Sequence, residues 1–401
     1  NMRIKINKNC VCENKNIPNK KNSIFIKNLP ITEIFTSMYK KSKKFQMNQQ
    51  IIFCNKCQHM SLMRFVDPKL IYNKNYLTSS TSSFSARYSN DIFHNFILKN
   101  INQREKYSKI LEIGTNDLYL LKKFQRNAKK LVGIDPVIKD DKKFKNFHPI
   151  KNFFTNVDNK RIGLDSDIII SGHTLEHVEN PEMFIKKIIS LAHNKTKVFL
   201  QFPSVESLIN NGSFDQVNHQ HLNYFSLNSF DKLLKKCGGK IIKHEYHELH
   251  FGVLMVFFTI KNSKLKSKID FKKNKKITSK DFIKSYKNFK MHLNAYKNLI
   301  EKYLFLKKKI YVIGAGLMLP IVNYHLDGIF EKVDSILDDD KSKQNKYFLN
   351  INKKITSLKK KNLENSICII STISSAIVTR KLTNILESKK AQVILVPTLT
   401  F

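Results

Sequence analysis

A short polar turn is the first place in this sequence where the residue types could bind a ligand. An apolar run over residues 109–111 leads into the hexapeptide E-I-G-T-N-D, which contributes Glu112, Gly114, Asn116 and Asp117. A strand that ends in such a turn and is followed by a helical pattern is typical of the first βα unit of a Rossmann-like sheet. The glycine lets a ligand approach the backbone closely, and we expect the polar side chains around it to line the bound ligand.

Asp135 adds a second candidate contact. It follows an apolar segment at residues 130–134, the second predicted strand, where Rossmann-like folds place a carboxylate that accepts a hydrogen bond from a ribose diol. The first turn has one glycine instead of G-x-G-x-x-G, so a pyrophosphate is poorly accommodated. A ligand with a ribose and no phosphates fits better, and the sequence predicts S-adenosylmethionine as the cofactor. The alternative role for Asp135 is a strand-end cap.

Several histidines follow the carboxyl ends of two further predicted strands. The first strand spans residues 167–171 and is followed by His173 and His177; the second spans 197–202 and is followed by a loop that contains His221. Because ligands collect at the carboxyl ends of parallel strands, we expect these imidazoles near one pocket, with His173 at the sulfonium end of the cofactor. A hydrogen-bonded structural role is the alternative for any one of them.

Four of the six cysteines form two close pairs near the N-terminus. Cys10 and Cys12 make a C-x-C pattern, and Cys54 and Cys57 make a C-x2-C pattern. Two such pairs in a chain without a secretory signal predict a tetrahedral structural zinc site rather than disulfides. His59 could replace one thiolate, and four reduced free thiols are the alternative to a metal site.

The chain carries a formal charge of +39, from 71 lysines and arginines against 32 acidic residues. Only seven of the basic residues are arginine, the side chain whose planar fork reads base edges and grips phosphates. The lysines are spread along the chain, so we predict no nucleic-acid partner; the charge could steer an anionic small substrate. No apolar run approaches the roughly 20 residues of a membrane span and no signal peptide is visible, which favours a cytoplasmic protein without a membrane partner.

Alternating strand and helix patterns predict an α/β fold with a central Rossmann-like domain. We expect a small zinc-binding domain over residues 1–70, the cofactor-binding domain over 71–260, a lysine-rich helical connector over 261–308 and a C-terminal Rossmann-like domain over 309–401. The last of these begins with an apolar strand and a G-A-G turn at 314–316, which could bind a substrate phosphate or NAD. These patterns leave the oligomeric state open, a monomer included.

Four motifs, taken in order, resemble those of the sugar C-methyltransferase family, whose members methylate nucleotide-linked keto-deoxysugars. The family's E-I-G-x-N-D-G-y-L-L is similar to Glu112–Leu121, its G-I-D-P to Gly133–Pro136, its L-E-H-V to Leu175–Val178, and its F-D-x-x-Y-H-E-H-x-x-Y-F-S to Phe214–Ser226. The resemblance spans almost the whole chain. It implies an N-terminal zinc knuckle, a central S-adenosylmethionine-dependent methyltransferase domain, a C-terminal Rossmann-like domain, and a nucleotide-linked sugar as substrate.

The resemblance also implies roles for single residues. The family's general base, the last histidine of Y-H-E-H, corresponds to His221, and the glutamate that assists it corresponds to Gln220. The active-site histidine of L-E-H corresponds to His177, and Tyr76 is the nearest match to a family tyrosine that precedes the Ser-rich loop. Carbon methylation beside a ketone needs removal of a proton, and a neutral imidazole near pH 7 suits that step.

Three positions depart from the family pattern. Gln220 cannot carry charge or relay a proton, Asn218 replaces the tyrosine that opens the motif, and Leu118 replaces the glycine after N-D. Gln220 can still orient an imidazole or bind a sugar oxygen, and Arg87 and His250 could reach the substrate's diphosphate. The departures leave room for methyl transfer to oxygen or nitrogen, and for a non-catalytic protein of the same fold that binds carbohydrate or nucleic acid.

Overall fold

The structure, a computed structural model, shows two compact units, each built from segments far apart in the sequence. Unit 1 comprises Asn1–Asn22, Ile51–Ser207 and Gln220–Ser279, and unit 2 comprises Ser23–Gln50, Leu208–His219 and Lys280–Phe401. The residues that the structure describes are 4–7, 9–15, 17–32, 34–39, 46–72, 76, 79–81, 84–138, 144–250, 252–267, 269–271, 276–371 and 376–396.

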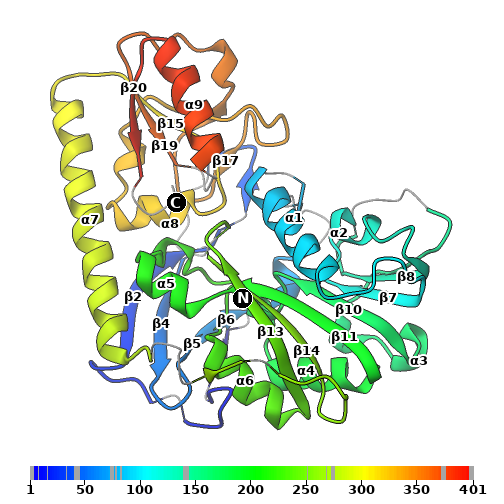
Figure 1. The fold of residues 1–401 in the computed structure, drawn as a ribbon. Helices are drawn as coiled ribbons and strands as arrows, with labels where there is room; N and C mark the ends of the chain where they lie inside the picture. Colours follow the sequence, from blue (N-terminus) through cyan, green and yellow to red (C-terminus); the bar gives the residue numbers. More distant parts are fainter. Residues whose placement is uncertain are drawn as a thin grey trace. The chain divides into compact units, whose positions relative to one another are not determined.

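A seven-stranded sheet forms the centre of unit 1 (Figure 1). In the order β13-β14-β11-β10-β7-β8-β9, the last five strands are parallel, and β14 runs antiparallel to both of its neighbours. The strand order reverses between β7 and β10, so the carboxyl ends of these two strands form the topological switch point where such sheets bind ligands. The strands are β7 (Tyr107–Ile113), β8 (Ala128–Ile134), β9 (Phe147–Ile150), β10 (Ser166–Gly172), β11 (Ala192–Pro203), β13 (Gly239–His247) and β14 (Val253–Ile260).

Both faces of this sheet are buried, which explains the nearly continuous apolar runs of its parallel strands. Successive strand residues point to opposite faces. In β10, Ile169 packs in a cluster with helices α4 (Pro181–Ser190) and α6 (Leu227–Lys236), whereas Ile168 packs in another cluster with α1 (Phe84–Leu98). The shorter helices are α2 (Tyr119–Lys122), α3 (Asn159–Ile162) and α5 (Val205–Asn211).

A second sheet, of order β12-β5-β4-β2, includes the hairpin that carries two of the cysteines. From Ile51 onward β4 (Gln46–Cys54) pairs antiparallel with β5 (His59–Leu62). Gln58 closes the turn with a φ of 63° and donates its N–H to the Cys54 carbonyl oxygen at 2.7 Å. The other two strands are β2 (Ser23–Pro30) and β12 (Asn223–Tyr224), and a separate pair in unit 1 is β1 (Ile4–Ile6) with β6 (Arg64–Val66).

Unit 2 contains a five-stranded parallel sheet of order β18-β16-β15-β19-β20. The predicted lysine-rich helix forms α7 (Ser279–Phe305), and its apolar stripe is core, since Phe282 and Phe289 lie 6.0 and 5.8 Å from the ring of Phe214. The other elements are β15 (Ile310–Ile313), β16 (Ser335–Leu337), β18 (Ile355–Thr356), β19 (Ile367–Ile370), β20 (Gln392–Leu395), α8 (Leu319–His325), α9 (Ala376–Ser388) and the pair β3 (Phe35–Thr36) with β17 (Tyr347–Phe348).

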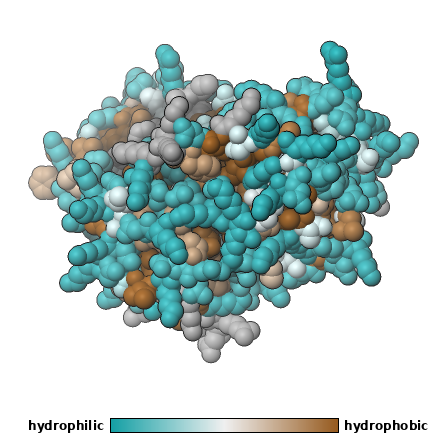
Figure 2. Space-filling view, turned by 60° about the horizontal axis from the view of Figure 1, so that its bottom comes forward, coloured by the Kyte–Doolittle hydropathy of each residue, from teal (hydrophilic) through white to brown (hydrophobic). Residues whose placement is uncertain are grey.

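The predicted α/β class is confirmed, because both larger sheets alternate strands with helices and reverse their order beside the first strand. On the face shown in Figure 2, hydrophilic side chains predominate and hydrophobic ones are scattered, as expected if most lysines are solvated. Within the described residues, none of the helices combines the length and the apolar character needed to cross a membrane.

Candidate active site at the carboxyl edge of the seven-stranded sheet

The turn after β7 packs against the turn after β10. Gly114 has a φ of +79°, a conformation that other residues adopt with strain, and a Cβ placed there would overlap the hydroxyl of Thr174. Leu118, the residue after Asp117, also has a positive φ, of 64°, although its side chain is fully buried and the family pattern has glycine at this position. Glycine at 114 is therefore required by close packing at the switch point.

Asp135, at the end of β8, is bonded to the same turn. Its Oδ2 accepts the N–H of Asn116 at 3.0 Å and its Oδ1 accepts the N–H of Val137 at 2.7 Å. Asp135 therefore caps the end of the strand, the role given above as the alternative to ligand binding. A carboxylate offers about four acceptor positions, so these two bonds are compatible with a further one to a ribose hydroxyl.

Asn116 and Asp117 hold a Ser/Thr-rich segment beside the turn. Ser80 donates its N–H to Asn116 Oδ1 at 3.3 Å, and Thr81 donates its N–H and its hydroxyl to Asp117 Oδ2 at 2.8 and 2.7 Å. Arg87, which we expected to reach a diphosphate, donates to the Thr81 carbonyl oxygen at 2.6 Å. In this structure these side chains are thus engaged in hydrogen bonds within the protein.

Glu112 is the second-last residue of strand β7 and is buried. Only 4 % of it is exposed, and its Oε2 accepts the hydroxyl of Thr115 at 2.9 Å. Burial, reinforced by the nearby carboxylates of Asp117 and Asp135, raises the pKa of Glu112 to about 8. At pH 7 this side chain therefore favours the neutral, protonated form.

This pKa predicts a specific pH dependence of stability. A carboxyl whose pKa is about 8 when folded and near 4.5 when unfolded binds more protons in the folded state between those values, so its contribution to stability falls as the pH rises from about 5 to 9. We expect the free energy of unfolding to fall by on the order of 2–4 kcal/mol from this group. Urea titrations of wild type and Glu112→Gln at pH 5, 7 and 9 isolate it: the stability difference should change with pH, and a flat difference would contradict the assignment.

His173, Glu176 and His177 follow β10. Glu176 lies in a 3-10 turn (Leu175–His177), is 1 % exposed, and has its Oε1 3.2 Å from His173 Nδ1 and 4.0 Å from His177 Nε2. Burial raises the pKa of Glu176 to about 7 and lowers that of His173 to about 4. One buried carboxyl group therefore contacts His173 and lies near His177, the two histidines predicted at this edge.

His221 lies against His177. Their ring centroids are 5.0 Å apart, edge to face, and the backbone N–H of Leu222 donates to the Glu176 carbonyl oxygen at 2.7 Å, which ties the two segments together. Burial is the main cause that lowers the pKa of His221 well below its usual value, and the neighbouring imidazoles lower it further. The imidazole is therefore neutral at pH 7.

Gln220 acts through its backbone. Its carbonyl oxygen lies 2.9 Å from His177 Nδ1, and since a carbonyl can only accept, that nitrogen carries the hydrogen. The lone pair of His177 is then on Nε2, the atom nearer to Glu176. Because the contact is made by the backbone, it does not depend on the glutamine side chain, whose expected role stays a prediction.

His219 has a different role from His221, although only one residue separates them. Within unit 2, Gln49 Nε2 lies 3.1 Å from His219 Nδ1, and His219 Nε2 donates to the Leu29 carbonyl oxygen at 2.8 Å. Both ring nitrogens are therefore used in the fold. Asn218, where the family pattern has tyrosine, donates to the Gln216 carbonyl oxygen at 3.1 Å.

Tyr72 lies beside His177, and Tyr76 lies beside Tyr72. The ring of Tyr72 lies 5.7 Å from that of His177 and 5.1 Å from that of Tyr76. Sequence reasoning selected Tyr76 and missed Tyr72, which contacts the histidine directly and lies in the same tyrosine-rich segment. Likewise it missed Glu176, although that residue is part of the L-E-H-V motif.

His250 belongs to the same cluster. Its ring lies 4.6 Å from that of His173, and its backbone has a φ of 52°. Burial lowers its pKa well below the usual value, so it favours the neutral form. A neutral imidazole can donate a hydrogen bond to a phosphate oxygen, but it brings no charge to the diphosphate contact expected from the sequence.

The four N-terminal cysteines come together in unit 1. Their sulfur atoms lie within 4.8 Å of one another; Cys10 Sγ is 3.4 Å from Cys57 Sγ, and Cys12 Sγ is 3.7 Å from Cys54 Sγ. Tetrahedral Zn–S bonds of about 2.3 Å would separate the sulfurs by roughly 3.8 Å, so these residues fit a zinc ion. None of these four cysteines forms a disulfide. His59 is not in the group; its ring packs on Phe225 at 4.6 Å.

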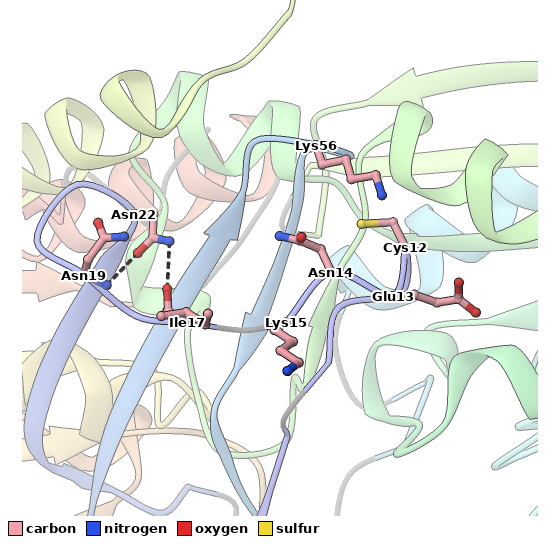
Figure 3. A pocket seen from close by; sticks show the side chains of 8 residues that line it. All are labelled: Cys12, Glu13, Asn14, Lys15, Ile17, Asn19, Asn22 and Lys56. Atoms are coloured by element: carbon pink, nitrogen blue, oxygen red, sulfur yellow. Dashed lines mark hydrogen bonds between the residues drawn. The ribbon is translucent and has the colours of Figure 1, made fainter.

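An open, polar hollow adjoins this cluster (Figure 3). Asn22 helps to shape it by donating to the Ile17 carbonyl oxygen at 3.1 Å and accepting the N–H of Asn19 at 2.8 Å. None of its lining residues is a candidate catalytic residue. They are Cys12, Glu13, Asn14, Lys15, Ile17, Asn19, Asn22 and Lys56.

Comparisons with known proteins agree with this geometry. Residues 86–244 match the family model of a methyltransferase domain. Over 216 residues the chain is 20 % identical to the C-methyltransferase NovU of Streptomyces niveus; the match covers 52 % of this chain and 50 % of NovU, so the chain spans about half the length of that relative.

Among solved structures, the chain is similar to the magnesium protoporphyrin IX methyltransferase ChlM of Synechocystis PCC 6803 with bound S-adenosylhomocysteine, at 13 % identity over 45 % of this chain and 89 % of ChlM, with a TM-score of 0.36. It is also similar to the N-methyltransferase NodS of Bradyrhizobium japonicum WM9 with the same ligand, at 11 % identity over 45 % of this chain and 90 % of NodS, with a TM-score of 0.36. The family model matches residues 86–244, the part of the chain that contains the carboxyl edge of the seven-stranded sheet, and it supports a methyltransferase activity for this part of the chain.

Proposed function

We propose that this protein transfers a methyl group from S-adenosylmethionine to a carbon atom of a nucleotide-linked keto sugar. The observation that carries the proposal is the contact between two neutral imidazoles, His177 after β10 and His221 after β11, within the residues that match a methyltransferase domain. Gly114 would admit the methionine part of the cofactor to the backbone, and Asp135 would accept a hydrogen bond from its ribose.

The histidines supply what carbon methylation needs from the protein. The C–H bond beside a ketone must break, with its proton passing to a base and its electron pair to the enolate. His221 would take that proton, while the Gln220 carbonyl oxygen, which accepts the Nδ1–H of His177, holds that imidazole beside it. When bound, S-adenosylmethionine would supply an electrophilic methyl group, and burial of His221 would keep water from competing for the proton.

Methyl transfer to oxygen or nitrogen is the second candidate. The observation that favours it is the residue at position 220, a glutamine whose side chain brings no charge to the proton transfer, together with Asn218 in place of a tyrosine. A hydroxyl group is more acidic than a C–H beside a ketone, and a neutral amine can attack the methyl group with its lone pair and lose its proton afterwards, so either acceptor would need less help from these positions.

Solvent deuterium distinguishes the two candidates. The full chain, S-adenosylmethionine and a set of nucleotide sugars in 4-keto and reduced 4-hydroxyl forms are incubated in D2O, and products are read by mass spectrometry and NMR. Carbon methylation predicts a product from the keto form only, with the new methyl on carbon and exchange at the acidic C–H position in recovered substrate. Methylation of the 4-hydroxyl form on oxygen would instead support the second candidate, and release of no S-adenosylhomocysteine with any substrate would contradict both.

We also propose that Cys10, Cys12, Cys54 and Cys57 hold a structural zinc ion. The site joins the N-terminal segment to the β4–β5 hairpin, so metal binding would stabilise the attachment of that segment to the hairpin. We expect metal analysis to find zinc in the wild type and roughly one ion fewer per chain in Cys54→Ser, with a lower melting temperature.

Cys237→Ser is the matched control. This thiol lies at the end of α6, also in unit 1, and contacts the Glu182 carbonyl oxygen at 3.7 Å rather than the cluster. Its replacement should leave the zinc content unchanged. Equal zinc content in wild type and Cys54→Ser would contradict the cysteine site.

A further inference from the structure

The buried carboxylate between the histidines is incompletely bonded. Glu176 Oε1 lies near His173 Nδ1 and His177 Nε2, but among the described residues no donor lies within hydrogen-bonding distance of Glu176 Oε2. Removing a carboxylate oxygen from water without a partner costs free energy, so such an atom commonly marks a place for a cation or a ligand group. Glu176 is 1 % exposed and His221 is 7 % exposed, so the group is shielded from solvent.

We propose that Glu176, His177 and His221 form a second metal site, one that takes a divalent ion such as Zn²⁺ or Co²⁺. Each residue offers one ligand atom, and these atoms lie within 4.8 Å of one another. Bonds of about 2.0–2.2 Å need neighbouring ligand atoms roughly 3.3 Å apart, so small side-chain rotations would close the group around an ion. Two imidazoles and one carboxylate suit ions of intermediate softness, which separates this site from the all-thiolate one.

The surroundings of the group resemble those of metal-ligating histidines. A histidine that binds a metal through one nitrogen usually donates its other N–H to a backbone carbonyl or a carboxylate. His177 does so through Nδ1 to the Gln220 carbonyl oxygen, which leaves the Nε2 lone pair on the side of Glu176. His173 Nδ1 contacts Glu176 Oε1 and would fix the carboxylate in turn. The Leu222 N–H bonded to the Glu176 carbonyl oxygen keeps the two ligand segments in register.

Metal binding at this site and proton transfer would exclude each other. An ion bound to His221 occupies the lone pair that a base needs, so the site would make the enzyme sensitive to inhibition by transition-metal ions. This consequence rests on the proposed function, whereas metal binding itself does not. The inhibition should be reversed by a chelator that leaves the cysteine-bound zinc in place.

Cobalt absorption tests the site on the zinc-loaded full chain. Added Co²⁺ bound to nitrogen and oxygen ligands gives visible ligand-field bands without the intense near-ultraviolet charge transfer of thiolate ligands. We expect one tight Co²⁺ ion per chain with the former spectrum, and at least a tenfold weaker affinity in Glu176→Gln. Glu179→Gln is the matched control, because Glu179 lies three residues further on, is exposed and pairs with Lys5 at 2.7 Å.

Several results decide the proposal. If Glu176→Gln does not fold, as judged by circular dichroism, His177→Gln serves instead, since its side-chain amide can replace the hydrogen bond to the Gln220 carbonyl. Unchanged Co²⁺ affinity in the folded variants, a thiolate-type spectrum, or no binding to the wild type would each overturn the site. If the wild type methylates its substrate but binds no Co²⁺, the metal site is refuted and the proposed function is not. If the wild type binds Co²⁺ as expected but methylates no substrate, the proposed function is refuted and the metal site is not. Tight Co²⁺ binding without inhibition would refute the competition.

Discussion

Replacement of His221 by alanine is expected to lower the rate of methyl transfer by about 10²–10⁴-fold, the range supplied by a positioned general base. The affinity for S-adenosylhomocysteine should stay near that of the wild type, because the predicted cofactor contacts lie in the turns after β7 and β8. Single-turnover kinetics and calorimetry measure the two quantities on the same preparation. Wild-type turnover in the variant would remove His221 as the base.

His219→Ala is the matched control, because His219 and His221 lie in the same loop and both substitutions remove an imidazole. Both ring nitrogens of His219 are bonded within unit 2, to Gln49 and to the Leu29 carbonyl. Its loss should therefore cost about 1–3 kcal/mol of stability, by leaving buried polar groups without partners, and should not remove the chemical step in protein that remains folded. A loss of turnover in His219→Ala equal to that in His221→Ala would show that the assay reports folding rather than catalysis.

Gly114→Ala is expected to weaken S-adenosylhomocysteine binding by more than tenfold and to destabilise the protein by about 2–4 kcal/mol. Two costs add up: the backbone has a φ of +79°, and the new methyl group would overlap the Thr174 hydroxyl and lie 3.2 Å from Thr174 Cβ. Relief of the overlap must displace either the β7 turn or the β10 turn, and both border the candidate cofactor pocket. Calorimetry and urea unfolding measure the two effects.

Two further variants separate the costs. Gly238→Ala places a methyl group at a φ of +85° with nothing within 4 Å, so it should show the backbone strain alone, about 1 kcal/mol. The double variant Gly114→Ala/Thr174→Ala removes the overlapping hydroxyl and should recover part of the stability and affinity. Equal effects of Gly114→Ala and Gly238→Ala would contradict close packing at the switch point.

The local sequence determined the elements and the class of the fold. Apolar runs such as residues 167–171 predicted strands buried on both faces, and they form β10 and its parallel neighbours. The same patterns predicted that a turn follows the first strand at 112–117 and that Asp135 lies at the end of the second strand. Both could be predicted because a strand end and the conformation of a glycine are properties of a few adjacent residues. The spacing of the four cysteines predicted that they would meet, and they do.

Only the tertiary structure decided which partner each polar side chain has. It bonds His219 into unit 2 while placing His221 against His177, and it uses Asn116 and Asp117 to hold Ser80 and Thr81. It also brings Glu176 between two histidines and groups residues 23–50 with the C-terminal part of the chain. The physical reason is that apolar periodicity records only which face of an element is buried, whereas hydrogen-bond partners depend on which distant segments the folded chain brings within about 3 Å.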